Sequence, residues 1–589
     1  MTADPSRRID CDVLVAGSGA GGLACAVVAA FHGLSVVVAE KEPVFGGTTA
    51  WSGGWLWIPR NPLARRAGII EEADEPLAYL RSEIGNRIAD PRIAAFLANG
   101  PDMVAFFEAN TAVEWIDGNR IPDFHDTPGS RVGGRSVCAK PYDGRALGAD
   151  IARLKPPLDL VSLAGMGISA GADMAHFFNA TRSPRSALHV AGRLARHARD
   201  LALHGRGLQL VNGNALVARL MKSALDLGVT LIEGAPVRAL HRDGARVCGA
   251  TIEREGRPVD VIARRGVVLA TGGFPHDRER IAALFDHAPE GDGHHSAAPR
   301  ANTGDGLRLG EAAGGRIAGD HIHAGAWCPV SLVPLKHGGQ AHFPHLVDRA
   351  KPGFIAVLPD GRRFVNEADS YHDFMKALFA ATPAGAAAQC WLIADHRAQR
   401  RFGLGWAKPF PFPLRRYESC GYLKSAPTLV SLAAACGLPA DVLAGTVDRF
   451  NAHARAGEDP DFGRGRSPYN GMQGDAAHGP NPSLGALETG PFHAVRLVPG
   501  SLGTFAGLTT DELARVLDGD GVPVQGLYAA GNDMASIFGG NYPSGGITLG
   551  PAMTFGYIAA RQMAGLPVCG ADRTQNRERT DEILRTGHA

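Results

Sequence analysis

The sequence has no pair of cysteines spaced as C-x-x-C, although it contains 9 cysteines in 589 residues. Iron–sulfur and zinc sites commonly use thiols at that spacing, so the sequence argues against both, and we expect no metal. Thiols scattered through so long a chain are typical of a reducing compartment, and we therefore expect a cytoplasmic protein.

Long apolar runs are missing too. The N-terminal residues, MTADPSRRIDCDV, contain no apolar signal core. No stretch approaches the roughly 18 uninterrupted apolar residues of a membrane span. We therefore expect neither a signal peptide nor a transmembrane segment.

The chain also has no basic block. Its formal net charge is +1, and its arginine clusters, such as the one at 397–401, are short. Nucleic acid is therefore not an expected partner. We find no internal repeat, and the length predicts more than one domain. These exclusions leave a large, packed, enzyme-like protein.

The first informative segment of the chain is residues 12–40, DVLVAGSGAGGLACAVVAAFHGLSVVVAE. The apolar run at 13–16 predicts a buried parallel strand. It leads into the residues GSGAGG at 17–22, which match the pattern G-x-G-x-x-G. An alanine-rich stretch predicts a helix, and residues 35–39 predict a second strand that ends at an acidic residue. The segment is typical of a dinucleotide-binding β-α-β unit.

Each part of this unit has a mechanical reason. Gly17 allows the tight turn, Gly19 lets the backbone approach a pyrophosphate, and Gly22 lets helix and strand pack closely. The helix that starts at Ala20 offers unpaired N–H groups to phosphate. Glu40 is placed to accept hydrogen bonds from a ribose.

Further glycine-rich segments indicate a cofactor longer than an adenosine group. A second loop, EKEPVFGGTTAWSGG, follows at 40–54. The residues GVVLATGGF at 266–274 and GLYAAGND at 526–533 each predict a short strand that runs into glycine. We interpret all of them as contacts to one extended ligand. The predicted cofactor-binding residues are Gly17, Gly19, Ala20, Gly22, Glu40, Lys41, Gly47, Thr48, Thr49, Ser52, Gly53, Gly54, Val237, Ala270, Thr271, Gly272, Gly531, Asn532, Ile547 and Leu549.

This pattern resembles the FAD-binding flavoproteins of the fumarate reductase and succinate dehydrogenase superfamily. The resemblance implies an α/β fold, in which an α+β substrate (cap) domain is inserted into a Rossmann-type FAD-binding domain. We expect the FAD-binding domain to comprise 1–274 and 488–589, and the cap to comprise 275–487. Covalently flavinylated relatives carry a histidine in the loop after the ribose-binding acid. The loop GGTTAWSGG has none, so we expect non-covalent FAD.

The C-terminal segment FGGNYPSGGITLGPAMTFGYIAA, 538–560, combines glycines with an amphipathic run. We expect the glycines at 539, 540, 545 and 546 to let the backbone pass close to flavin and substrate. The resemblance implies that the helix beginning near Pro551 presents its positive end to the flavin N1–O2 region. Proline in the first helical turn costs little, because its missing N–H would be unpaired there anyway.

Tyr542 lies where fumarate reductases place an arginine that clamps a carboxylate. A phenol cannot form that two-point clamp, but it can donate one hydrogen bond to a neutral carbonyl. We therefore do not expect succinate or fumarate to be substrates.

The residues around Tyr542 and Gly546 are similar to those of the 3-ketosteroid Δ1-dehydrogenase family. So are RGLQLVNGNALVARL at 206–220, GSLGTFAGLTTD at 500–511 and the motif GRRFVNE at 361–367. The resemblance implies that the Tyr542 hydroxyl and the Gly546 N–H hold the ketone oxygen as it gains enolate character. A base takes the α-proton, and the β-hydrogen leaves as hydride to flavin N5.

The sequence departs from that family at two positions. The steroid enzymes use further tyrosines as base and helper, and we align these with Phe124 and Phe343, which cannot transfer a proton. Histidine is a suitable base near neutral pH. The candidates are His125 and His345, followed by His321 and His323.

These departures leave several functions open. The main prediction is an FAD-dependent dehydrogenase that introduces a C=C bond next to the carbonyl of a small apolar ketone, either a 3-ketosteroid or another cyclic ketone. It would pass electrons to an external acceptor such as a quinone. Trp55, Trp57 and Trp115, if near the flavin, would narrow the pocket for a cyclohexanone-type substrate. The alternatives are a flavin-dependent alkene reductase fed by an external donor and a non-catalytic flavin-binding protein.

Overall fold

A largely parallel sheet forms the centre of the cofactor-binding part of the chain. The computed structural model describes residues 8–569. β1 pairs in parallel with β2 on one side and with β11 on the other. The sheet runs β22-β23-β11-β1-β2-β8, and β9 and β10 extend it from β11. The bounds are β1 Arg8–Ala16, β2 Val36–Ala39, β8 Thr230–Ile232, β9 Val237–Asp243, β10 Arg246–Arg254, β11 Arg257–Leu269, β22 Arg515–Leu517 and β23 Pro523–Ala529.

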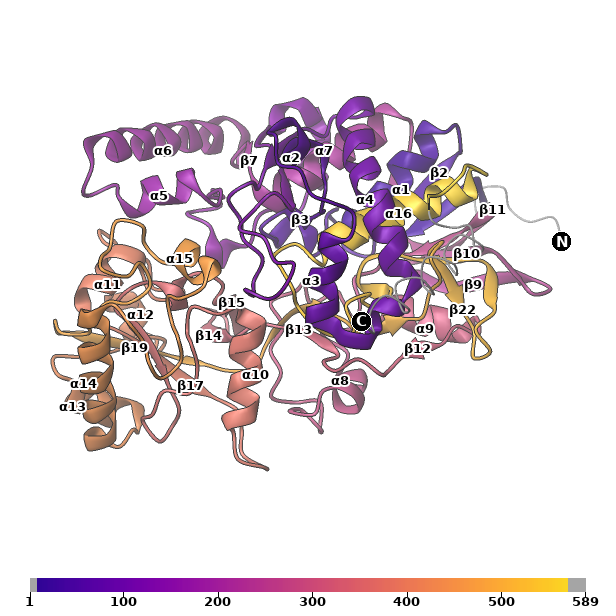
Figure 1. The fold of residues 1–589 in the computed structure, drawn as a ribbon. Helices are drawn as coiled ribbons and strands as arrows, with labels where there is room; N and C mark the ends of the chain where they lie inside the picture. The colour runs from indigo at the N-terminus through magenta and orange to yellow at the C-terminus, as the bar shows by residue number, and fades with distance from the viewer. Residues whose placement is uncertain (1–7, 570–589) are drawn as a thin grey trace.

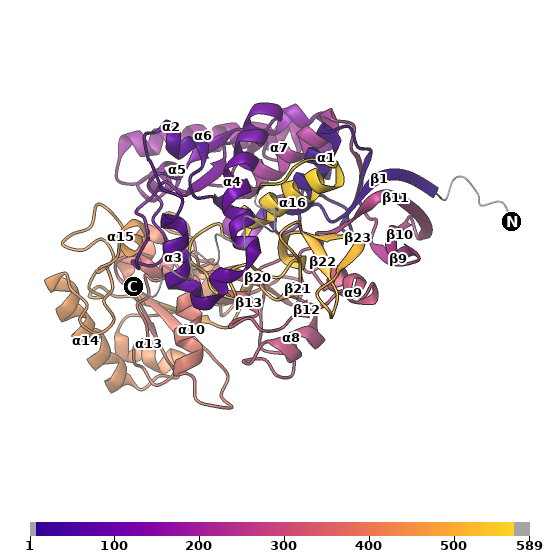
Figure 2. The same ribbon diagram turned by 45° about the vertical axis from the view of Figure 1, so that its right-hand side comes forward.

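Apolar composition explains why β1 lies in the middle. Residues 13–16 are almost fully buried, because a parallel strand covered on both faces must be apolar throughout. Helix α1, Ala20–Phe31, follows the strand, and α16, Leu549–Met563, packs beside α1. Figures 1 and 2 show the two helices next to each other, although they come from opposite ends of the sequence. The predicted β-α-β unit and closing helix are therefore confirmed, with Pro551 in the first turn of α16.

A second, antiparallel sheet belongs to the cap and runs β16-β17-β19-β18. Its last strand in the sequence, β19, comes after the predicted boundary at residue 487. β19 combines His493 and Arg496 with apolar residues, and this pattern carries no signal of which sheet the strand joins. The bounds are β16 Phe354–Val357, β17 Cys390–Ala394, β18 Lys424–Ala426 and β19 Phe492–Leu497; the cap helices include α10 Tyr371–Ala381, α11 His396–Phe402, α13 Leu429–Cys436, α14 Ala440–Ala456 and α15 Pro468–Gln473. The α/β fold class is confirmed.

Two further helices, α5 (Ala172–Phe178) and α6 (Pro184–His204), extend from the cofactor-binding part toward the cap helices α11 and α15 (Figure 1). The Phe178 ring meets the Phe402 ring edge-on at 5.5 Å. Lys408 Nζ donates to the carbonyl of Ser162 at 2.7 Å, just before α5. These contacts join the two parts of the chain around the space between them.

Within residues 8–569, no helix combines the length and apolar character needed to cross a bilayer. The expectation of no signal peptide concerns the N-terminal residues. Residues 1–7 lie outside the described part of the chain, and so do residues 570–589.

The contact between α1 and the preceding turn can be tested at Gly22. A Cβ at this position would collide with the carbonyl oxygen of Gly17. We therefore expect Gly22→Ala to lower stability by about 1–3 kcal/mol, the usual cost of overpacking, and to reduce FAD content.

The matched control is Gly192→Ala in α6, where an added Cβ meets nothing within 4 Å. That variant should be neutral or stabilised by up to about 1 kcal/mol. Thermal unfolding and flavin absorbance measure both effects. Equal stability of the two variants would refute the packing role of Gly22.

Candidate active site

One large cavity lies between the parallel sheet and the cap. Its volume is about 1820 Å³, and its walls come from both parts of the chain and from α5 and α6. Pockets for a single small molecule usually measure roughly 300–1,000 Å³. The cavity therefore has room for a cofactor and a substrate side by side.

The predicted cofactor-binding residues line this cavity, with Gly22 and Ile547 as the exceptions. Gly22 instead packs against the Gly17 turn, as its place in the motif predicts. Ile547 is buried in the core beside the closing loop. Both residues support the cavity wall from behind.

Glu40 fixes the glycine-rich turn at the end of β1. Its carboxylate accepts hydrogen bonds from the Ser18 N–H at 3.0 Å, from the Ser18 hydroxyl at 2.5 Å and from the Glu42 N–H at 2.9 Å. Burial raises the pKa of Glu40, although these hydrogen bonds oppose the rise. Lys41 pairs with Asp305 at 2.7 Å and so ties the loop after β2 to helix α9, Asp305–Ala312.

The walls fit an elongated dinucleotide. A Cβ added at Gly47 or Gly531 meets no protein atom within 4 Å, because both positions face the cavity. The N-termini of α1 and α16 face it too, through Gly19 and Ala20 at one end and Thr548 and Leu549 at the other. Two positive helix ends suit the pyrophosphate and the electron-rich ring of FAD.

Tyr542 lies at the cap side of the cavity inside a group of aromatic rings. It is only 4% exposed. Phe124 stacks on it at 5.7 Å, Tyr371 meets it edge-on at 5.1 Å, and the His372 and Phe505 rings lie at 5.7 Å. Burial raises the pKa of Tyr542 to about 12, although the neighbouring side chains of Tyr371 and Thr548 oppose the rise. Tyr542 is therefore a neutral hydrogen-bond donor at ordinary pH.

Gly546 lines the cavity beside this tyrosine and must be glycine. Its φ is 101°, and a Cβ there would lie 2.6 Å from the Trp57 nitrogen and 2.7 Å from the Trp55 oxygen. Its carbonyl accepts hydrogen bonds from Trp57 and Gly550. Within residues 8–569 the structure gives its N–H no protein acceptor, so this donor is free for a ligand.

The closing loop corrects one expectation. Gly545 and Gly546 line the cavity, but Gly539 and Gly540 do not. A Cβ at Gly540 would lie 2.5 Å from the backbone of His323, and one at Gly539 would press on the side chain of Arg87. These two glycines let the loop pack against neighbouring protein segments rather than against a ligand.

The histidine candidates for the base lie outside the cavity wall formed by the described residues. His125 lies between Glu83 and Asp373, and its Nε2 is 2.7 Å from Asp373 Oδ2. Burial acts to lower the pKa of His125, but the two carboxylates outweigh it and raise the pKa to about 10. An imidazole that is already protonated cannot take a proton from a substrate.

His345 is fully buried, and both of its ring nitrogens are engaged. Nδ1 lies 2.8 Å from Asp348 and Nε2 lies 2.7 Å from Ser331. Neither His125 nor His345 contributes to the cavity wall within the described residues, and the same holds for His321 and His323.

Tyr371, which the sequence analysis missed, is the ionisable group next to Tyr542. It is the first residue of α10, lines the cavity, and its ring meets the Tyr542 ring edge-on at 5.1 Å. Phe343, which we aligned with a catalytic tyrosine, lines the cavity and packs on the His345 ring instead. The sequence does indicate a helix that begins at Tyr371, because the motif GRRFVNE continues as ADSYHDF and Ser370 is a clear N-cap.

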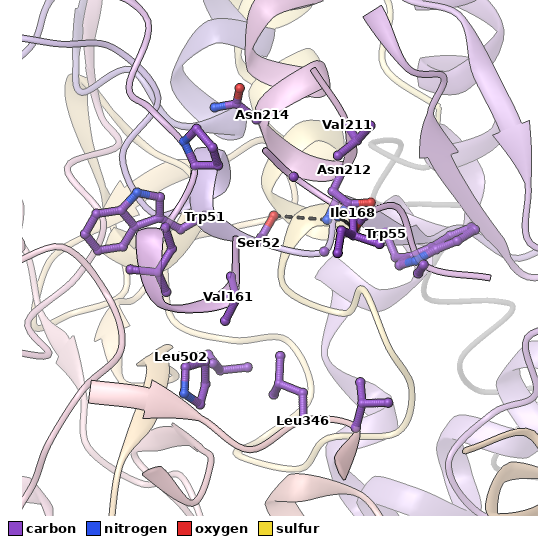
Figure 3. A pocket seen from close by; sticks show the side chains of 18 of the residues that line it. Trp51, Ser52, Trp55, Val161, Ile168, Val211, Asn212, Asn214, Leu346 and Leu502 are labelled. Atoms are coloured by element: carbon purple, nitrogen blue, oxygen red, sulfur yellow. Dashed lines mark hydrogen bonds between the residues drawn. The ribbon is translucent and has the colours of Figure 1, made fainter. Parts of the chain in front are cut away.

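The tryptophans divide between cavity and core. Trp55 lines the cavity, while Trp57 and Trp115 are buried and donate to Asp123 and to the Val104 carbonyl. Figure 3 shows Trp55 and Ser52 on one side of the cavity, facing the apolar side chains of Leu346 and Leu502. Of the three tryptophans, only Trp55 is placed to narrow the substrate space.

Comparison with known proteins agrees with this geometry. A family model described as an FAD binding domain matches residues 12–549. The chain is 41% identical to a 4-oxocyclohex-2-ene-1-carboxylate 5-dehydrogenase of Sinomonas cyclohexanicum, over 96% of this chain and 95% of that protein. It is 37% identical to a 3-oxosteroid 1-dehydrogenase of Mycobacterium tuberculosis, over 94% of this chain and 98% of that protein.

Among solved structures, the fold is similar to that of a 3-ketosteroid delta1-dehydrogenase from Sterolibacterium denitrificans in complex with 1,4-androstadiene-3,17-dione. The TM-score is 0.87 and the identity is 34%, and the match covers 94% of this chain and 99% of that one.

The loop after Glu40 predicts how the cofactor is held. Because GGTTAWSGG contains no histidine, we expect acid precipitation of the purified protein to release a yellow supernatant. Flavin that stays in the pellet after a second acid wash would contradict non-covalent binding.

Proposed function

The chain belongs to the family of FAD binding domains that its sequence matches from residue 12 to residue 549, and on that premise we propose that it desaturates a cyclic ketone. It is an FAD-dependent oxidoreductase acting on CH–CH bonds, and the new C=C bond forms next to the carbonyl. The observation that carries the proposal is the pair of hydrogen-bond donors, the Tyr542 hydroxyl and the free Gly546 N–H, on the wall of the cofactor cavity.

These donors would hold the ketone oxygen. Charge develops on that oxygen as the α-proton leaves, and preorganised donors stabilise it most strongly in a dry site. Tyr542 is neutral and nearly inaccessible to water, so its proton is available for the bond. Among the described residues, no protein acceptor competes for the Gly546 N–H.

We assign removal of the α-proton to Tyr371. Burial raises the pKa of Tyr371 well above its ordinary value, and the neighbouring Tyr542 adds to the rise. Burial also raises the pKa of Tyr542, and the neighbouring Tyr371 opposes that rise, which fits Tyr371 as the donor to Tyr542 in the proposed relay. The α-proton can then pass to the Tyr371 oxygen while the Tyr371 proton moves to Tyr542 and the Tyr542 proton moves to the ketone oxygen. Both phenols end neutral, and the ketone becomes its enol.

FAD, when bound, would supply the acceptor for the β-hydrogen, which leaves as hydride. The enol O–H proton is released as the C=C bond forms, so that the enone product is neutral. The N-terminus of α16 faces the same part of the cavity and favours negative charge there. Phe124 and Phe343 contribute apolar walls in place of proton-transferring groups. Phe124, which contacts both rings, helps to exclude water from the two tyrosines.

The substrate class is a cyclic ketone, either a 3-ketosteroid or a smaller ring. The apolar walls at Trp55, Leu346 and Leu502 support an apolar substrate body (Figure 3). The relatives support both classes, since one acts on a 3-oxosteroid and another on an oxocyclohexene carboxylate. Turnover also requires an external electron acceptor, which we propose to be a quinone or similar compound. A cytoplasmic location fits the scattered thiols.

We propose the domain order flavin, cap, flavin, with bounds near 1–274, 275–487 and 488–589. We further propose that the second boundary lies a little later, after β19. The pairing of β19 with β17 and β18 supports this change.

Anaerobic flavin bleaching tests the function. We expect the absorbance of the bound flavin to fall within seconds when the protein meets its ketone, because hydride transfer needs no oxygen. A panel of 3-ketosteroids, cyclohexanones and 4-oxocyclohexanecarboxylates would identify the substrate class. Succinate serves as the negative control, since Tyr542 replaces the carboxylate-clamping arginine. Bleaching by succinate but by no ketone would overturn the proposal.

Tyr542→Phe tests the donor pair. Removing the hydroxyl while keeping the ring should lower kcat by about 10²–10³-fold, the usual cost of losing one oxyanion donor. KM and flavin content should change little, because the hydrogen bond strengthens only in the transition state. Tyr371→Phe should give a loss of similar size if the two hydroxyls form one relay.

The matched control is Tyr417→Phe, which removes a buried hydroxyl in the cap core, bonded to Arg416. It should leave kcat unchanged. A fully flavin-loaded Tyr542→Phe protein with normal turnover would remove Tyr542 from the mechanism.

A further inference from the structure

His125 connects the cofactor-binding part of the chain to the cap. Its Nδ1 bonds to Glu83 on α3, Glu75–Ile84, and its Nε2 lies 2.7 Å from Asp373 on the cap helix α10. The proposed mechanism does not use this histidine, and the cavity lining of the described residues does not include it. The side chain instead joins two segments that the sequence separates by 248 positions.

The surroundings of His125 keep it charged. Two carboxylates face it, one from each part of the chain, and outweigh burial, so that its pKa rises to about 10. Thr127 donates to Glu83 at 2.7 Å and Ser370 donates to Asp373 at 2.5 Å. Lys376 binds the other oxygen of Asp373 at 3.0 Å. Asp369 and His372 are the further titratable groups whose charges interact with His125.

Both ends of this ion-pair bridge adjoin the catalytic rings. Asp373 comes two residues after Tyr371 on α10, and His125 directly follows Phe124. The Phe124 ring stacks on Tyr542 and meets Tyr371 edge-on at 5.7 Å. A change in the bridge therefore reaches the Tyr371–Tyr542 pair within one helical turn.

The segment before His125 is itself firmly held. The Asp123 carboxylate accepts from Arg135 at 2.6 Å and from the Trp57 indole at 2.9 Å. The Phe124 N–H donates to the carbonyl of Pro543, next to Tyr542. This anchoring fixes His125 relative to the closing loop, and the bond to Asp373 transfers that position to α10.

We propose that His125 is a positioning residue whose bridge between Glu83 and Asp373 sets the alignment of Tyr371 against Tyr542. This inference rests on the proposed function, because alignment matters only if the two hydroxyls transfer protons. A displacement of about 1 Å is enough to cost roughly 10²-fold in rate.

His125→Gln is the first test, since glutamine keeps the approximate size and loses the charge. We expect kcat to fall about 10- to 100-fold, with KM and flavin content nearly unchanged. Asp373→Asn should give a similar loss, and the double variant should lose no more than the worse single one, because both residues act through one bond. Lys376→Gln is the matched control: it removes another partner of Asp373 but leaves the bridge in place, and it should retain normal kcat.

The pH profile separates this role from simple folding support. The stabilising contribution of charged His125 is complete below pH 6.5, which is the pKa of histidine in an unfolded chain. This contribution is lost as the pH rises through about 10, the pKa of His125 in the folded protein. Wild-type kcat should therefore decline as pH approaches 10, and the decline from this group should be absent in His125→Gln. A normal kcat in His125→Gln, or additive losses in the double variant, would overturn the proposal.

Hydrogen exchange provides a readout that does not depend on the reaction. The amides of 371–376 should exchange faster in His125→Gln than in wild type, and Lys376→Gln should not show the change. Unaltered exchange would refute the bridge even if no ketone proves to be a substrate. If no ketone bleaches the flavin of the wild-type protein, but exchange does increase in His125→Gln, the proposed function is wrong and the bridge between the two parts is still supported.

Discussion

The close packing of α1 against α16 is the contact on which the rest of the site depends. A Cβ at Gly556 would collide with the carbonyl oxygen of Gly21, so the two helices touch through their backbones. This contact brings the first nucleotide-binding turn and the closing loop, which lie more than 500 positions apart, to one cavity. The N-termini of both helices then face the same ligand, and the positive ends act together.

The cap supplies what this scaffold lacks. The parallel sheet and its two helices explain cofactor binding, but the rings around Tyr542 come from several segments. Phe124 belongs to the cofactor-binding part, Tyr371 to α10 and Tyr469 to α15. Burial raises the pKa of each of these tyrosines, so the group works as a set of neutral donors and acceptors rather than as preformed phenolates.

The sequence carries clearer signals for the cofactor site than for the base. Glycine-rich turns after buried strands are local signals, because a backbone that approaches phosphate excludes side chains at fixed spacing. Tyr371 and His125 depend on contacts between segments that lie far apart in the sequence, and nothing near His125 indicates Glu83 or Asp373. Histidine was a reasonable choice from its ordinary pKa, but two carboxylates change that pKa by more than composition reveals. The pairing of β19 with β17 and β18 depends on contacts of the same kind, since the sequence of β19 suits a strand of either sheet.

Phenylalanine at 124 and 343 changes what the remaining tyrosines must do. With apolar rings at these positions, the phenols of the described cavity wall are those of Tyr371, Tyr469 and Tyr542, and we propose that the transfer uses the hydroxyls of Tyr371 and Tyr542. A relay through two phenols tolerates little misalignment, because each oxygen must accept one proton while it donates another. The two hydroxyls belong to different parts of the chain. The ion-pair bridge beside them has one carboxylate from each part, and we propose that it keeps the two hydroxyls aligned.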